Sequence, residues 1–263
     1  MSDTAQQTAI SPNILQKDMG GFDVDPMHQF EVHRIIPIEI GSLDASFTNS
    51  SLWMLLVTGL VSLFTISAMR GRSFVPGRLQ SVAELSYEFI ANMLRQNVGH
   101  EGQRYFPFIY TLFMFILFSN MLGMLPYSFT VTSHIVVTFA LAAFIFIGVT
   151  VIGFARHGIR FLEFFVPKGV PVALLPLLVV IEVISYLTRP ISLSVRLFAN
   201  VMAGHTMLKV FAGFVVAMGL LGGWLPLGFM VAFTGLEILI AFLQAYVFAI
   251  LTCIYLNDAL HMH

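Results

Sequence analysis

Three charged residues share one face of a long apolar segment. Arg196 lies within the overwhelmingly apolar stretch 169–255, and Arg189 and Glu182 precede it in steps of seven residues. Seven residues are nearly two helical turns, so the stripe they form drifts by only about 20° per step. A charge at the bilayer centre costs about 3 kcal/mol on insertion scales and is rarely kept for packing alone. The stripe therefore indicates ion movement rather than membrane anchoring.

A second polar set follows on the next apolar segment, after a turn expected near Gly222. His205 lies 17 residues before Gly222 and Glu237 lies 15 residues after it, so both are expected at a similar depth in the outer half of the membrane. Arg196 lies 26 residues before the turn and Gln244 lies 22 after it, which predicts that these two residues lie near mid-depth.

The residue types suggest a pathway for protons in two separate parts. His205 and Glu237 can both accept and release protons, so they could relay protons between the outside and mid-membrane. Glu182, in the inner half, could relay protons between mid-membrane and the inside. Arg196 stays charged at any accessible pH. It would block a leak between the two parts, and it would favour the ionised form of a carboxylate on a partner surface.

Structural alternatives stay open for several of these residues. Arg189 could be a snorkelling or interface arginine, and Glu182 could merely form an ion pair with it. His205 could be a hydrogen-bonded core histidine, and Lys209 could simply extend toward the outer interface.

Three amide side chains also lie within the apolar segments. Asn200 and Gln244 could hydrogen-bond to either the arginine or the proton carriers, whereas Asn120 and Asn200 could equally join helices to one another. The one cysteine, Cys253, cannot form an internal disulfide and is expected to be a small core residue. No histidine pair within a span has metal-ligand spacing, so neither a metal nor a cofactor is expected.

The composition predicts an all-α integral membrane protein. The chain has 263 residues, of which 57% are hydrophobic and only 10% are charged, with a mean hydropathy of +0.86. A soluble domain is nearer a quarter charged. The net charge of -1 argues against a nucleic-acid partner, and residues 1–46 contain no continuous apolar core that would indicate a cleavable signal peptide.

The apolar runs predict an N-terminal outer segment, 1–50, and one membrane domain, 51–263, with five spans. A span needs roughly 20 apolar residues, and the candidates are 52–69, 106–125, 134–154, 171–218 and 227–256. Residues 78–98 differ, because apolar residues recur there at helical spacing between charged ones, which predicts an amphipathic interfacial helix.

The last two spans are too long to cross a membrane upright. At 1.5 Å per residue they would reach about 70 Å and about 45 Å. They must therefore tilt strongly as a hairpin, and the first of them must also kink at Pro176 or Pro190 or hold a buried bend if it does not simply tilt.

The loop charges predict the orientation. The connections 70–104 and 155–168 hold eight Lys and Arg residues, whereas the connections 127–133 and 219–226 hold none. By the positive-inside rule the first pair is cytoplasmic. Five spans then put the N-terminus outside and the C-terminus in the cytoplasm.

The chain resembles subunit a of the F-type ATP synthases. The resemblance rests on residues 190–200, 203–205 and 237–248, which read PISLSVRLFAN, AGH and EILIAFLQAYVF. It covers roughly residues 26–258 in layout. The order of the acid and the histidine is similar to the alphaproteobacterial and mitochondrial arrangement, which implies a bacterial inner membrane and, less readily, a mitochondrial one.

The resemblance implies a proton-translocating stator subunit with no catalytic site of its own. Arg196 corresponds to the essential arginine that faces the rotor ring, His205 and Glu237 to the outer access channel, Glu182 to the inner channel, and Gln244 to a hydrogen-bonding partner. The implied partners are the ring of c subunits, b-type peripheral stalk subunits, the rest of the ATP synthase, membrane lipid and protons. Many bacterial members carry an acid in the second span, where this chain has Ser119 and Asn120.

Two other classes fit the sequence less well. An ion-coupled secondary transporter would show an internal repeat and paired broken helices, and neither is found. An intramembrane enzyme would need a motif such as His-Glu-x-x-His or Gly-x-Ser-x-Gly, and neither occurs. The sequence leaves open whether the ion is a proton or sodium, and it does not give the size of the ring.

Overall fold

The chain folds as an all-α integral membrane protein, as its sequence predicts. The computed structural model describes residues 34–36, 39–40, 43–44, 46–70, 76–125, 128–166, 171 and 174–261. Five helices within these ranges are long and apolar enough to cross a membrane. Most of the segment 1–50, including all of 1–33, lies outside the described residues.

The membrane helices follow the apolar runs of the sequence. They are α2 (Asn49–Arg70), α4 (Phe106–Gly123), α5 (Ile135–His157), α6 (Leu175–Gly222) and α7 (Trp224–Leu260). The amphipathic helix α3 (Arg78–Val98) has the predicted bounds. Three short 3-10 helices lie beside them: η2 (His100–Tyr105), η3 (Val131–Ser133) and η4 (Gly158–Phe165).

Two pairs of very short antiparallel strands precede α2. β1 (Arg34–Ile36) pairs with β4 (Phe47–Thr48), and β2 (Glu39–Ile40) pairs with β3 (Leu43–Asp44). They are not predicted from the sequence, because strands of two or three residues are too short to show the alternation of apolar and polar residues that marks a strand.

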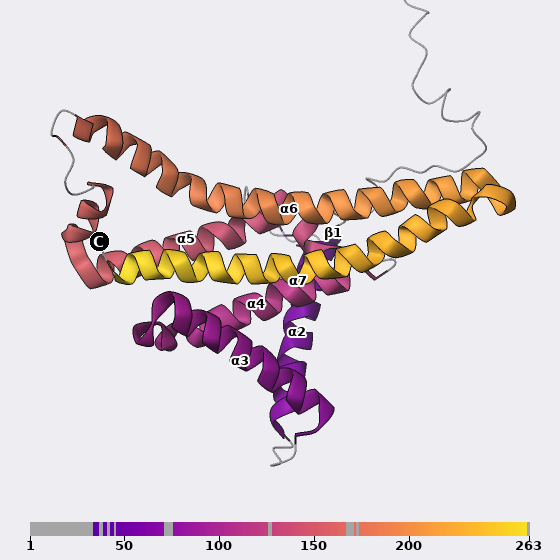
Figure 1. The fold of residues 1–263 in the computed structure, drawn as a ribbon, viewed down its shortest axis with the longest axis horizontal. Helices are drawn as coiled ribbons and strands as arrows, with labels where there is room; N and C mark the ends of the chain where they lie inside the picture. Colours follow the sequence, from indigo (N-terminus) through magenta and orange to yellow (C-terminus); the bar gives the residue numbers. More distant parts are fainter. Residues whose placement is uncertain are drawn as a thin grey trace, which may run out of the picture.

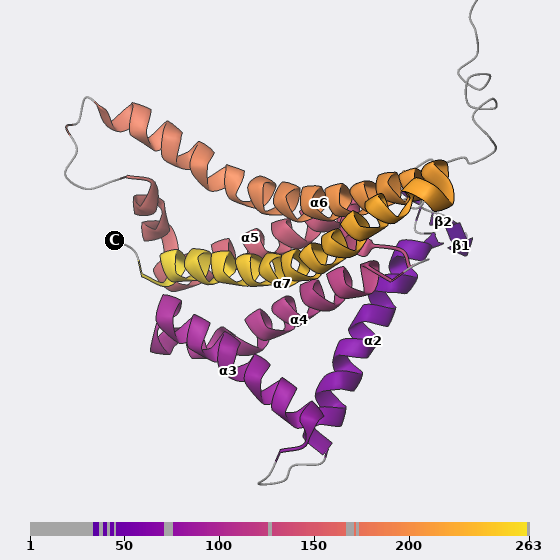
Figure 2. The same cartoon turned by 45° about the vertical axis from the view of Figure 1, so that its right-hand side comes forward.

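Helices α6 and α7 form a long antiparallel hairpin that lies against α4 and α5 (Figures 1 and 2). They contain 48 and 37 residues, so each is tilted rather than upright in a bilayer. Neither Pro176 nor Pro190 breaks α6. The only non-helical residue inside it is Gly219, with φ 59°, a left-handed conformation that glycine adopts readily.

The hairpin therefore turns between Gly219 and Gly223. A side chain at Gly223 would place its Cβ 2.6 Å from the Gly219 carbonyl oxygen. The close approach of the backbone at this turn requires glycine there.

One face of α7 carries small residues at every fourth position. Ala241, Ala245, Ala249 and Cys253 lie above one another on the helix, and all four are buried. Small side chains let neighbouring helices approach closely, and α4 and α5 pack against α7. Glu237 comes one step before Ala241 in this series, so the packing of α7 directs it toward the protein interior.

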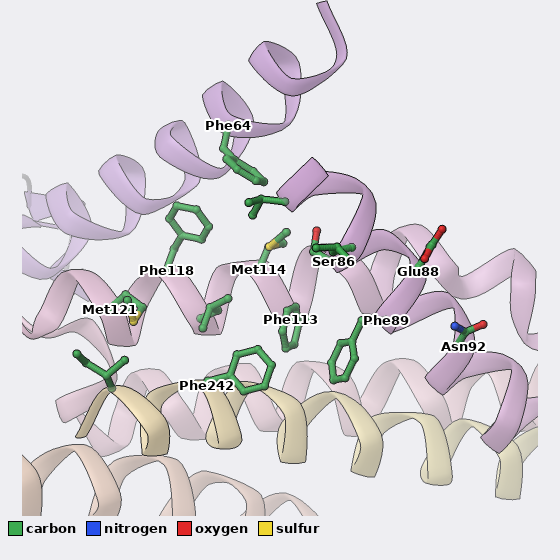
Figure 3. A pocket seen from close by; sticks show the side chains of 14 residues that line it. Phe64, Ser86, Glu88, Phe89, Asn92, Phe113, Met114, Phe118, Met121 and Phe242 are labelled. Carbon is green, nitrogen blue, oxygen red and sulfur yellow. The ribbon is translucent and has the colours of Figure 1, made fainter. Parts of the chain in front are cut away.

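Helix α3 is buried only in its second half. Ile90, Leu94 and Val98 join the hydrophobic core, whereas Val82 and Leu85 are exposed. These exposed residues border a cavity of about 780 Å³ between α2, α3, α4 and α7. Figure 3 shows its aromatic walls, which include Phe64, Phe89, Phe113, Phe118 and Phe242.

Candidate functional site

The six candidate residues lie on the two arms of the hairpin. Glu182, Arg196, Asn200 and His205 are on α6, and Glu237 and Gln244 are on α7. The structure brings four of them together around one small cavity of about 20 Å³, namely Asn200, His205, Glu237 and Gln244. Arg196 and Glu182 are not among its lining residues.

The proton-carrying pair links the two helices. His205 Nε2 lies 3.8 Å from Glu237 Oε1, and the two side chains are only 12% and 13% exposed. A third group comes from the loop after α4, where the Thr130 hydroxyl lies 3.3 Å from His205 Nε2. Two side chains that can exchange protons are thus held side by side in a nearly dry environment.

An amide pair lies next to it. Asn200 Nδ2 donates a hydrogen bond to Gln244 Oε1 at 2.9 Å, which joins α6 to α7 a second time. Asn120 of α4 lines the same cavity, and its Oδ1 accepts a hydrogen bond from the Thr132 hydroxyl at 2.9 Å. The sequence alone left Asn120 as a helix-packing candidate, because nothing in it shows that α4 borders the His205–Glu237 pair.

Three buried polar atoms face this region without a protein partner among the described residues. They are Asn120 Nδ2, Glu237 Oε2 and Gln244 Nε2. A buried polar atom without a partner is unfavourable by about 1–3 kcal/mol. Such atoms persist where water, an ion or a moving proton supplies the partner.

A glycine makes room for the acid. A side chain at Gly204 would place its Cβ 2.7 Å from Glu237 Oε1 and 3.2 Å from its Cδ, so the carboxyl group packs against bare backbone. The dipeptide Gly204-His205 therefore supplies both the space and the partner for Glu237. The sequence motif contains this glycine, but its purpose depends on the approach of α7.

We expect Gly204→Ala to displace the Glu237 carboxyl group. Because a misplacement of about 1 Å can cost a reaction up to about 100-fold, the rate of ATP-driven proton pumping should fall by about tenfold. Gly235→Ala is the matched control, since its Cβ would meet nothing within 4 Å. Pumping by membrane vesicles that contain equal amounts of assembled complex measures the difference. Equal rates for the two variants would contradict the role assigned to this contact.

Arg196 lies apart from the cavity, on the exposed face of α6. The opposite face is buried, with Leu193, Ser194 and Leu197 packed into the protein, and the Ser194 hydroxyl lies 3.1 Å from that of Thr138 on α5. No ion pair joins Arg196 to any residue in the part of the chain that the structure describes. Its charge is therefore available to a partner outside this chain.

Arg189 differs from its neighbours in the charged stripe. Its Nη1 lies 2.9 Å from Asp258 Oδ2 near the end of α7, so it pairs with Asp258 and not with Glu182. The alternative that Glu182 and Arg189 form an ion pair is therefore wrong. Asp258 was missed from the sequence, although it is the one acid in the last twenty residues.

A family model described as ATP synthase A chain matches residues 51–257 of this chain. The chain belongs to the ATP synthase subunit a family. It is 64% identical to "ATP synthase subunit a" of Parvibaculum lavamentivorans, over 92% of this chain and 95% of the relative. The relatives of the same name from Pelagibacter ubique and Rhodospirillum rubrum are 61% and 59% identical, over 91% and 90% of this chain and 98% and 99% of the relatives.

Membership in the ATP synthase subunit a family agrees with the sequence resemblance and with the five apolar helices. It also disfavours the secondary transporter and the intramembrane enzyme as descriptions of this chain. The ATP synthase subunit a described here is a multi-pass membrane protein.

Proposed function

We propose that this chain is the proton-translocating stator subunit of an F-type ATP synthase membrane sector. It would guide protons to and from the carboxylates of a rotor ring of c subunits, beside b-type stalk subunits, and it would leave ATP chemistry to other subunits. The observation that carries the proposal is the buried His205–Glu237 pair beside the Asn200–Gln244 amide pair, with Arg196 on an outward face nearby. The expected location is a bacterial inner membrane.

The outer half of the path would run through His205 and Glu237. Their cavity of about 20 Å³ exceeds the roughly 10–15 Å³ that one water molecule needs. A water there would accept hydrogen bonds from the Asn120 and Gln244 amides and donate one to Glu237 Oε2, and these are the three atoms that lack partners. A proton arriving at His205 could then pass to Glu237 and onward toward the ring.

The inner half would run along α6 past Glu182, which lies 14 residues before Arg196 on the same stripe. Arg196 would separate the two halves, because a fixed cation repels protons and holds a ring carboxylate in its ionised form. Each half alone stops near mid-membrane. A proton could cross only by riding on the rotor from one half to the other.

Water-soluble thiol reagents test this two-part path. In a chain whose Cys253 has been replaced, we expect Ser185→Cys, beside Glu182, to react from the cytoplasmic side. Val201→Cys, which lines the cavity, should react from the outer side. Ser192→Cys, one turn before Arg196, should react at least about tenfold more slowly from both sides, because a half-channel that ends near the arginine leaves this turn dry.

Labelling of right-side-out and inverted vesicles measures each rate, and Cys at exposed Arg160 serves as the control for reagent access from the cytoplasm. Fast labelling of Ser192→Cys from both sides would reveal a continuous pore, which would dissipate the gradient without turning a rotor. That result would contradict the proposed function and favour a channel or transporter.

A further inference from the structure

A caged ion pair fastens the two arms of the hairpin near the end of α7. Arg189 Nη1 donates a hydrogen bond to Asp258 Oδ2 at 2.9 Å, and the side chains are 19% and 26% exposed. Charge-assisted hydrogen bonds of this length are roughly twice as strong as neutral ones. We call this pair the Arg189–Asp258 latch.

Aromatic rings from three elements surround the arginine. Its guanidinium carbon lies 4.9 Å from the ring centre of Tyr255 on α7, 5.2 Å from that of Tyr186 on α6 and 5.8 Å from that of Phe164 in η4. All three distances are within the range of cation–π attraction. The Tyr186 hydroxyl also lies 2.7 Å from that of Thr150, which adds α5. Four elements therefore converge on one cation.

The latch lies where the arms separate. On the N-terminal side of Pro190, the inner arm of α6 diverges from α7 in both views (Figures 1 and 2). This arm carries Glu182. Toward the turn, α6 stays beside α7 and carries Arg196 seven residues after Arg189. Tyr255 is near enough to feel the charges of both Arg189 and Arg196.

We propose that the Arg189–Asp258 latch is a positioning pair for proton translocation. By holding α6 at the point of divergence, it would fix Glu182 and Arg196 relative to each other and to the rotor ring. By pairing Arg189, it would also keep a second unpaired cation away from the ring carboxylates, so that Arg196 acts on them alone. The inference rests on the proposed function.

A double-mutant cycle of Arg189→Gln and Asp258→Asn in the intact complex tests the latch. Each single variant leaves a charge or an amide without its partner in a mostly buried place, and we expect the number of protons pumped per ATP hydrolysed to fall by about fivefold. The double variant has no unpaired charge, and its two amides can hydrogen-bond, so coupling should recover to within about twofold of the parent. The corresponding cycle at the exposed pair Arg156–Glu101 is the control and should show no coupling change.

The ratio of protons to ATP is measured only on assembled complex, so a purely structural role would lower the yield without changing the ratio. Arg189→Lys provides a milder variant if the single variants assemble poorly, and it should give an intermediate ratio because it keeps the charge but loses the planar fork. Parent-like ratios in all these variants, or a double variant no better than the worse single one, would overturn the inference. If Arg196→Ala is inactive while this cycle is flat, only the latch fails; if Arg196→Ala pumps normally, the proposed function fails.

Discussion

Arg196→Ala is expected to abolish both ATP-driven proton pumping and ATP synthesis while the complex still assembles. Arg196 is exposed and pairs with no described residue of this chain, so its removal leaves the packing of α6 intact. What is lost is the only fixed charge between the two halves of the proposed path. We expect a loss of at least about 100-fold, which corresponds to about 2.7 kcal/mol.

Arg196→Lys should fail almost as completely. Lysine can lose its proton in an apolar environment, and it lacks the planar fork with which arginine holds a carboxylate. Proton uptake by inverted vesicles, normalised to the amount of assembled complex, measures both variants. Arg160→Ala, a change at an exposed arginine of η4, is the control and should pump at the parental rate. Coupled pumping by either Arg196 variant at more than a tenth of that rate would refute the separating role of the arginine.

Much of the fold follows from the sequence, because a membrane requires long apolar runs. The amphipathic helix α3 has the predicted bounds, and the hairpin of two overlong helices is confirmed. The expected kink at Pro176 or Pro190 is absent. A membrane helix tolerates an internal proline where neighbouring groups satisfy the freed backbone, and Pro190 is buried among such neighbours. The bend lies instead at Gly219, where a positive φ is favourable.

The site is predictable in part, because depth along a hairpin can be counted. Equal distances from the turn place His205 opposite Glu237, and the structure has the two side chains 3.8 Å apart. Asn120, Gly204 and Asp258 could not be assigned in this way. Their roles arise from contacts between α4, α6 and α7, and neither spacing along one helix nor hydropathy encodes which side chains of different helices meet.

His205 and Glu237 are expected to act as one unit. Each single replacement by Ala interrupts the same outer path, so we expect proton pumping to fall by about 30-fold in either variant. Independent effects would multiply in the double variant, whereas a shared path predicts a double variant little worse than the poorer single one. Proton uptake by inverted vesicles with matched amounts of complex measures this cycle. Thr234→Ala is the control, because Thr234 is exposed on α7 and bonds only to its own helix.

The exchange of the two residues, His205→Glu together with Glu237→His, gives the stricter test. The pair lies at one depth, and both members can carry a proton, so the order of acid and base should matter less than their presence. We therefore expect the exchanged variant to pump at about a tenth of the parental rate or more, well above either Ala variant. The backbone at Gly204 should still accommodate the side chain on α7, because it leaves space beside position 237. An exchanged variant that assembles fully yet pumps no better than the Ala variants would show that the two side chains do not serve one path.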